Sequence, residues 1–176
     1  THYGPGNSDH HDIAWVEFDN DGDPEQYIIH GREQHNQLFG NEGNGVWDDG
    51  ASAAGVADSD GRGRELHAPD FDLDGRLDIF VVTDYRGGFP RPNVLFWNNG
   101  DRTFDRVSGA GDMHQTRLHT SGVDYDLDGY TDIFTTTPHS WPGEVYRNNG
   151  DRTFTEVSQS VFPGISEPLR EAQGLA

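Results

Sequence analysis

Three acidic runs of the same pattern recur along the chain at nearly constant spacing. They read EFDNDGDPE from Glu17, DFDLDGRLD from Asp70 and DYDLDGYTD from Asp124, and their central glycines lie 53 and 54 residues apart. A fixed period of this length is typical of proteins built from repeated structural units, each of which buries its faces by stacking on its neighbours. The spacing therefore predicts three copies of one unit.

Each acidic run leads into a segment rich in β-branched and aromatic residues. These segments read QYIIH, IFVVT and IFTTT and end at His30, Thr83 and Thr137, so they predict strands rather than helices. Further along the copies, Asn-Asn-Gly-Asp separates two strand-like runs at Gly100 and Gly150, which indicates a tight hairpin. Four short antiparallel strands per copy is the simplest count.

We expect an all-β fold made of β-propeller blades, because four antiparallel strands in a repeat of about 50 residues match one blade. Residues 1–176 are expected to form a single propeller segment with repeats at approximately 8–60, 61–115 and 116–169. Residues 170–176 resemble the segments before the second and third acidic runs and predict an extra strand that starts a fourth repeat. A closed propeller needs at least about four blades, so this one is incomplete or is completed by association.

The acidic runs have the composition of calcium-binding loops. Ca²⁺ takes about six to eight oxygen ligands, and each run offers acidic side chains at positions 1, 3, 5 and 9, a carbonyl at position 7 and a glycine for the sharp bend. About three Ca²⁺ ions are therefore expected as cofactors, with Asp23, Arg76 and Tyr130 contributing carbonyls. The expected ligands are Glu17, Asp19, Asp21, Asp23 and Glu25, then Asp70, Asp72, Asp74, Arg76 and Asp78, then Asp124, Asp126, Asp128, Tyr130 and Asp132.

Other interpretations of the acidic runs fit less well. An EF-hand needs a glutamate at position 12 and a helix on each side, whereas position 12 here is Val81 or Thr135 and β-rich segments follow. Mg²⁺ keeps several waters and rarely occupies an all-protein cage. Solvated Asp-Gly turns are common, but three acidic runs that recur at the same place in each repeat favour a bound cation. The first loop departs from the pattern through Glu17, Pro24 and Glu25, and we expect it to bind calcium most weakly.

The charge of the chain restricts its partners. There are 12 basic and 31 acidic residues, which give a formal net charge of −19, and a surface of that sign repels nucleic-acid backbones and anionic lipid headgroups. No nucleic-acid partner is therefore expected. No apolar stretch approaches the roughly 20 residues of a membrane span, so no membrane insertion is expected either. The chain has no cysteine, which excludes disulfides and thiolate metal sites.

The runs DFDLDGRLDIFVV and DYDLDGYTDIF, each followed by NNGDRTF, resemble FG-GAP or VCBS repeats. The acidic loops are similar to those of integrin α-subunit propellers, and the hairpins are closer to bacterial VCBS proteins and the cartilage acidic protein type. The resemblance covers nearly the whole chain. It implies a secreted, extracellular β-propeller with calcium loops at the blade edges and a role in adhesion, in glycan binding or as an accessory domain.

Three functions are compatible with these patterns. The first expectation is a non-enzymatic extracellular module for adhesion or structural self-assembly, whose partners are other copies of itself in a ring or head-to-tail fibre, or the rest of a longer propeller. The second is a glycan-binding lectin, with Trp141 in the loop TPHSWPGE as the sugar-stacking candidate. The third is a propeller enzyme or enzyme accessory domain, such as a lyase, that uses His67 or His119.

Histidine and aromatic positions outside the acidic runs carry weaker signals. His10 and His11 show no metal-site spacing such as HExxH, and no catalytic residue is expected. Trp47 and Phe104 occupy the same hairpin position as Phe154. We expect all three rings to pack between neighbouring repeats.

Overall fold

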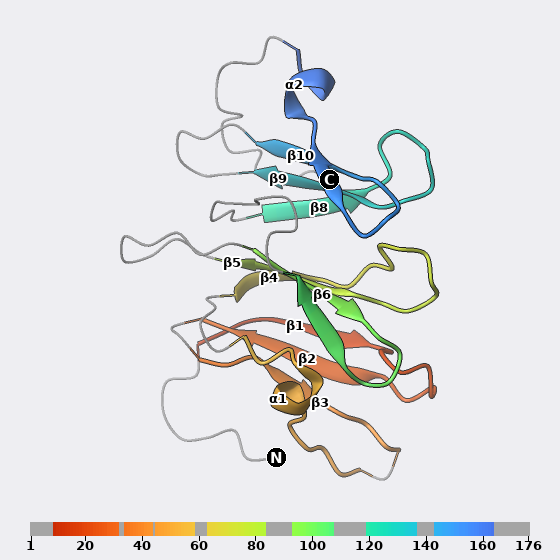
Figure 1. Cartoon of the computed structure of the whole chain (residues 1–176). Helices are drawn as coiled ribbons and strands as arrows, with labels where there is room; N and C mark the ends of the chain where they lie inside the picture. The colour runs from red at the N-terminus through yellow and green to blue at the C-terminus, as the bar shows by residue number, and fades with distance from the viewer. Residues whose placement is uncertain are drawn as a thin grey trace.

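Within its described part the chain is all-β, with three antiparallel sheets and two helices of four residues each. Figure 1 shows the sheets stacked on one another, with the N-terminal sheet at the bottom and the C-terminal sheet at the top. The helices of this part are too short to span a membrane. The computed structural model describes residues 9–31, 34–43, 45–58, 63–83, 93–107, 119–136 and 143–163.

The second and third sheets each contain four strands in the order of the chain. The second sheet lies within residues 61–115 and the third within residues 116–169. The predicted hairpins at Gly100 and Gly150 are confirmed, since they join antiparallel neighbours in each sheet. The elements are β4 (Gly63–His67), β5 (Ile79–Thr83), β6 (Val94–Asn98) and β7 (Phe104–Val107), then β8 (His119–Val123), β9 (Asp132–Thr136), β10 (Glu144–Asn148), β11 (Phe154–Glu156) and α2 (Ser158–Val161).

The first sheet has three strands, so the expectation of four strands is wrong for this repeat. In the place of the fourth strand, Asp49 forms a single antiparallel bridge to Phe39. The Asp49 carboxylate accepts hydrogen bonds from the backbone N–H groups of Leu38 and Ala51. The Asp49 carboxylate thus accepts from the β3 backbone in place of a carbonyl of a fourth strand, and the chain continues into a short helix. The elements are β1 (His10–Val16), β2 (Glu25–His30), β3 (Gln37–Phe39) and α1 (Ala51–Ala54).

Two hydrophobic cores join the sheets. The core between the first and second sheets contains Tyr27 and Ile29 from one side and Val81 and Phe96 from the other, with the alanines of α1 at its edge. The core between the second and third sheets is formed in the same way by Phe80, Leu95, Trp97, Ile133 and Tyr146. Strands β5 and β6 of the middle sheet are buried on both faces, which explains the unbroken apolar run IFVV in β5.

The first strands of neighbouring sheets, β1, β4 and β8, are linked by a repeated hydrogen bond. The Asp12 carboxylate of β1 accepts from the Leu66 backbone N–H of β4 at 3.0 Å. The Glu65 carboxylate of β4 accepts from the Thr120 backbone N–H of β8 at 2.7 Å. Asp12 and Glu65 lie five residues before their acidic loops, so the same link joins both pairs of sheets.

The aromatic residues of the hairpins are not equivalent. Phe104 and Phe154 are buried in the two cores, as expected. Trp47 does not pack between described repeats, and its ring instead makes an edge contact with Trp15, with centroids 5.7 Å apart. The expectation is wrong for Trp47 because its side chain lies on the outer face of the first sheet, against which no other described sheet packs.

Candidate metal-binding loops

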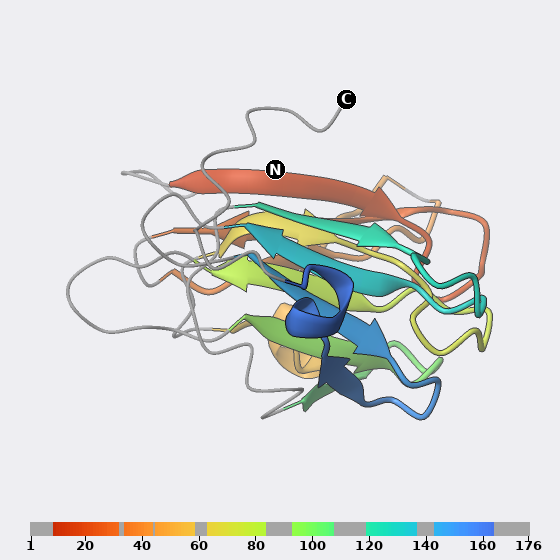
Figure 2. The ribbon, with the colours of Figure 1, turned by 90° about the horizontal axis from the view of Figure 1, so that it is seen from above.

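The three acidic loops, residues 17–25, 70–78 and 124–132, project from the same end of the stack (Figures 1 and 2). Each connects the first strand of its sheet to the second. In loop 70–78, the Asp70 carboxylate accepts hydrogen bonds from the backbone N–H groups of Asp74 at 3.1 Å and Gly75 at 2.9 Å. Gly75 has a φ of 86° and Leu73 a φ of 59°, so two left-handed residues bend the loop back on itself.

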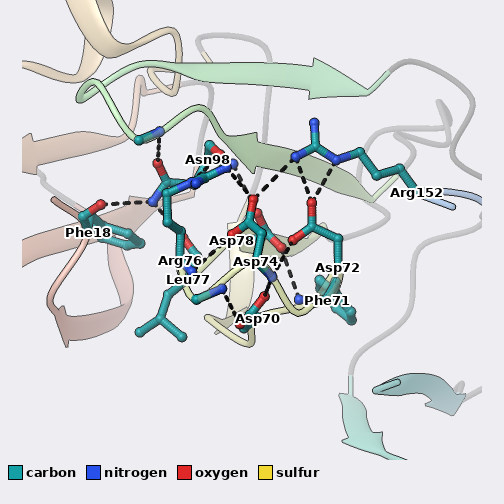
Figure 3. A network of polar contacts seen from close by, with 12 residues as sticks. Phe18, Asp70, Phe71, Asp72, Asp74, Arg76, Leu77, Asp78, Asn98 and Arg152 are labelled. Atoms are coloured by element: carbon teal, nitrogen blue, oxygen red, sulfur yellow. Dashed lines mark hydrogen bonds and ion pairs between the residues drawn. The ribbon is translucent and has the colours of Figure 1, made fainter. Parts of the chain in front are cut away.

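The carboxylate at position 9 anchors the second and third loops to their sheets. Asp78 is buried and accepts hydrogen bonds from the backbone N–H groups of Phe71 at 3.0 Å and Asn98 at 2.9 Å (Figure 3). Asp132 occupies the same place in the third loop, where it accepts from Tyr125 and Asn148. Because the second and third strands of the sheet are fixed by their ladders, this carboxylate is held at the base of the loop before any ion binds.

The structure brings carboxylates together in all three loops. Oxygen atoms of positions 1, 3 and 9 lie within 4.8 Å of one another in each loop, and in the first loop Asp21 at position 5 joins them. The other two position-5 residues, Asp74 and Asp128, do not belong to these groups. The clusters are Glu17, Asp19, Asp21 and Glu25; Asp70, Asp72 and Asp78; and Asp124, Asp126 and Asp132.

The residues at position 7 turn their side chains toward the hairpin of their own repeat. A Cβ on Gly43 would lie 2.6 Å from an Asp23 oxygen, one on Gly100 would lie 2.9 Å from the Arg76 Cδ atom, and one on Gly150 would meet the Tyr130 ring at 2.7 Å. Each hairpin glycine also has a positive φ, 65° at Gly43, 79° at Gly100 and 73° at Gly150, which favours glycine there. With the side chains of position 7 turned to the hairpins, the backbone carbonyls of Asp23, Arg76 and Tyr130 stay predicted ligands.

Crowding of acids in a buried place changes their protonation. Burial raises the pKa of Asp78 to about 7, with Asp72 and Asp74 adding repulsion, although its two backbone hydrogen bonds act in the opposite direction. Burial likewise raises the pKa of Glu25 to about 7, and the other carboxylates of its loop add to this. The pKa of Asp132 is also raised by burial. Each loop thus holds negative charge that a cation would stabilise.

The first and second loops are also covered by the hairpin of the next repeat, a contact that the acidic runs alone do not predict. The Asn98 amide donates to the Phe18 carbonyl of the first loop at 2.9 Å and to the Leu77 carbonyl of its own repeat at 3.0 Å. The Asn148 amide repeats this pattern with Phe71 at 2.7 Å and Thr131 at 3.2 Å. The only signal in the sequence is the recurring NNGDRTF, whose first asparagine makes these contacts.

Arginine from the same hairpins lies on the acids of the preceding loop. The Arg152 guanidinium contacts Asp72 at 2.6 Å and Asp74 at 3.5 Å (Figure 3). It also lies 5.2 Å over the Trp97 ring. Arg102 forms the corresponding contacts with Asp19 and Asp21. The acidic loops and hairpins of neighbouring repeats therefore form one polar network.

The histidines singled out in the sequence take structural contacts. His67 lies 3.6 Å from Glu65, the residue that links β4 to β8. The His11 ring contacts the Gly63 carbonyl at 2.5 Å and Asp9 at 3.2 Å. In the described part of the chain, none of the carboxylate clusters includes a histidine. Trp141 and residues 170–176 lie outside the described residues.

A match to a protein-family model identifies the family of this chain. The model of the FG-GAP-like repeat matches residues 17–81 and 124–170, which include all three acidic loops. The chain belongs to the FG-GAP-like repeat family. The resemblance seen in the acidic runs and hairpins is confirmed by this match.

Comparison with solved structures shows how far the likeness of this FG-GAP chain extends. A lectin structure from Agrocybe aegerita, described in terms of specific recognition of non-reducing terminal N-acetylglucosamine, aligns with a TM-score of 0.58 at 18% identity. The alignment covers 85% of this chain and 38% of the lectin chain, so the FG-GAP chain spans well under half of that structure's length. At this identity the likeness shows the fold. No curated protein matches the sequence.

Proposed function

We propose that this chain is a calcium-binding segment of an extracellular β-propeller that serves adhesion or structural self-assembly rather than catalysis. The observation that carries the proposal is the set of three carboxylate clusters, one in each repeat, at the same end of the stack. Membership of the FG-GAP-like repeat family supports the propeller and the secreted location. The ions would stiffen the loops and hold the neighbouring hairpins in place.

The donor set fits calcium. Every clustered ligand is a carboxylate oxygen, and the carbonyls of position 7 add a neutral oxygen donor, which suits a hard cation with a large and flexible coordination sphere. The raised pKa values of Glu25 and Asp78 support a bound cation, because buried carboxylates that repel one another are stabilised in their charged form by a nearby positive charge. The residues that would hold the ions are the clustered acids together with Asp74 and Asp128.

Calcium titration tests this proposal. Isothermal titration of the chelator-treated protein is expected to show about three bound Ca²⁺ ions, and chelation is expected to lower the melting temperature because the ions bind the folded state selectively. Asp19→Asn, Asp72→Asn and Asp126→Asn should each remove or weaken one site. Asp105→Asn, which alters an exposed acid of β7, is the matched control. A protein that binds no calcium and melts unchanged in chelator would contradict the proposal.

A lectin function is the second candidate, and a pocket favours it. A cavity of about 510 Å³ lies between the hairpins of the first and second repeats, lined by apolar Leu38 and Phe104 and by polar Asp48 and Arg102. It exists because Gly40 stands where the second repeat has Trp97, the ring that lies under Arg152. Space under Arg102 is therefore left for a ligand of monosaccharide size.

Glycan binding tests the second candidate directly. Binding on a glycan array is expected to be lost in Gly40→Trp, because the new ring would fill the cavity and no atom lies within 4 Å of a Cβ at this position. Arg102→Ala should weaken binding as well. Leu73→Ala, at an exposed position of the second loop, serves as the control. Binding that survives Gly40→Trp would exclude this pocket, and no binding to any glycan would exclude the lectin.

A further inference from the structure

The outer face of the first sheet and the outer face of the third sheet carry the same kinds of side chains that meet where neighbouring sheets of the stack pack together. We propose that a second copy of this chain packs the outer face of its first sheet on the outer face of the third sheet, so that copies associate head to tail. This contact is heterologous, and it closes into a ring or continues as a fibre according to its rotation. The inference rests on the proposed self-assembly function and identifies its partner and its surfaces.

The junction between sheets is seen twice within the chain and serves as the template. In both cases a phenylalanine of the following hairpin contacts the position-2 ring of the preceding loop edge to face. The centroids are 5.4 Å apart for Phe104 on Phe18 and 5.5 Å apart for Phe154 on Phe71. The hairpin asparagine donates to the carbonyl of the same position-2 residue. A third junction of this kind needs one hairpin face and one loop face.

The outer face of the first sheet is the hairpin half of such a junction. Ile13 and Trp15 are 47% and 58% exposed. They stand at the same distance before their acidic loop as Leu66 and Ala68 do before theirs, and Leu66 and Ala68 pack into the core between the first two sheets. Trp47, at the position of Phe104, lies against Trp15 on this face. The first sheet therefore exposes large apolar side chains where the second sheet uses its equivalents to dock.

The hairpin asparagine of the first repeat is oriented for the same role. The Asn41 amide donates to the Pro24 carbonyl at 3.2 Å, which matches the bonds of Asn98 to Leu77 and of Asn148 to Thr131. Asn98 and Asn148 each use the second N–H of their amide to reach the preceding loop. Among the described residues, Asn41 has no preceding loop to reach.

The outer face of the third sheet is the loop half. Val123 is 46% exposed, whereas Val16 at the same position of the first repeat is 8% exposed. Tyr125 is only half-buried and rests on Phe134 of its own sheet, with ring centroids 5.8 Å apart. Its equivalents Phe18 and Phe71 are fully covered by the hairpins of the next repeats. Trp47 of a second copy would meet Tyr125 as Phe104 meets Phe18.

The contact between copies differs from the internal junctions in its charges. Gly45 stands at the hairpin position that Arg102 and Arg152 hold in the later repeats, so a second copy brings no arginine to the acids of loop 124–132. Repulsion at this loop would be lowered by a bound Ca²⁺. Association between copies should accordingly require calcium and depend mainly on apolar contact.

Mixing two single-face variants tests the pairing of the faces. Sedimentation of the calcium-loaded wild type should show association, and Trp15→Lys on the first sheet and Val123→Lys on the third should each be monomeric. An equimolar mixture of the two variants should form a one-to-one dimer, because each supplies the face that the other lacks. Leu73→Lys, an exposed apolar residue of the middle repeat, should associate like the wild type. Self-association of either single variant, or a mixture that stays monomeric, would overturn the proposal.

A gain-of-function variant gives an independent test. Gly45 has a φ of 76°, close to the 66° of Arg102 and Arg152, and a Cβ at Gly45 meets no atom within 4 Å. Gly45→Arg should supply the missing ion pair with Asp126 and Asp128 and tighten association by about threefold. Gly45→Glu has the same backbone requirement and should weaken it. Equal effects of the two substitutions would contradict the proposed contact.

Calcium binding measured on the same samples separates the two proposals. A wild type that binds three Ca²⁺ ions but remains monomeric up to its solubility limit overturns the head-to-tail contact and leaves the calcium module intact. A wild type that binds no calcium overturns the proposed function itself.

Discussion

The second and third acidic loops have nearly the same local structure but very different surroundings. In both, the position-1 carboxylate accepts from the backbone N–H groups of positions 5 and 6, at 3.1 and 2.9 Å. Loop 70–78 is covered by Asn148, Arg152 and Phe154 of the next repeat, whereas no described repeat follows loop 124–132. The comparison shows that the loop conformation is encoded within nine residues and that its burial comes from the neighbouring repeat.

The largest difference should appear at position 2 of the two loops. Phe71→Ala is expected to lower the free energy of unfolding by about 4 kcal/mol, because a buried ring is removed from the core between the second and third sheets. Tyr125→Ala should cost about 1 kcal/mol, since its ring is only half-buried and rests on Phe134 of its own sheet. Urea unfolding in excess calcium measures both. Equal losses would show that the third loop is covered as well as the second.

The hairpin asparagines offer the next contrast. Asn148→Ala should lower the free energy of unfolding by about 3 kcal/mol, because the buried carbonyls of Phe71 and Thr131 lose their donor. Asn41→Ala should cost less than about 1 kcal/mol, since its amide bonds to Pro24 and Gly43 are both exposed. Chemical denaturation of the two variants under identical conditions gives the difference. A larger loss in Asn41→Ala would contradict the assignment of Asn148 as the link between repeats.

The calcium-free protein should lose stability as the pH rises. Burial raises the pKa of Asp78 to about 7 from an ordinary value of 3.8, so above pH 4 the native state keeps a proton that the unfolded chain has released. The free energy of unfolding then falls between pH 5 and 7 by on the order of 1–2 kcal/mol. Thermal melts in chelator would record this slope.

Two variants localise the pH effect. Asp78→Asn should reduce the slope without removing it, because the pKa of Glu25 is also raised to about 7. Asp132→Asn should reduce it less, because loop 124–132 is not covered on its outer side by a described repeat. Asp105→Asn should leave it unchanged. A stability that rises from pH 5 to 7 without calcium would refute the buried, protonated state of these acids.

Arg152→Ala should give the smallest effect. Its guanidinium is 43% exposed, and ion pairs of this exposure contribute less than about 1 kcal/mol. The loss should shrink further at high salt, which screens the contacts with Asp72 and Asp74. Arg147→Ala is the matched control, since this exposed arginine contacts the Asn149 side chain. A loss of several kcal/mol in Arg152→Ala alone would mean that the arginine is essential to the junction.

Much of the architecture could be predicted from the sequence. The period of the acidic runs, the strands that follow them and the hairpins at Gly100 and Gly150 all appear as predicted, because turn glycines and β-branched residues act over a few neighbouring positions. Positions 1, 3 and 9 of the loops do converge. The prediction failed at the fourth strand of the first repeat and at Trp47, where the outcome depends on what packs against the sheet.

The sequence by itself determined the spacing of the acidic runs, the course of each acidic loop and which carboxylates gather in it, since these follow from local hydrogen bonds and left-handed backbone positions. Only the tertiary structure decided that Asn98 and Asn148 bond to the loop of the preceding repeat and that arginines lie on its acids. It also decided that Ile13, Trp15 and Val123 stand exposed. The asparagine and arginine bonds between repeats join residues about 80 positions apart. They form because stacking brings distant segments together.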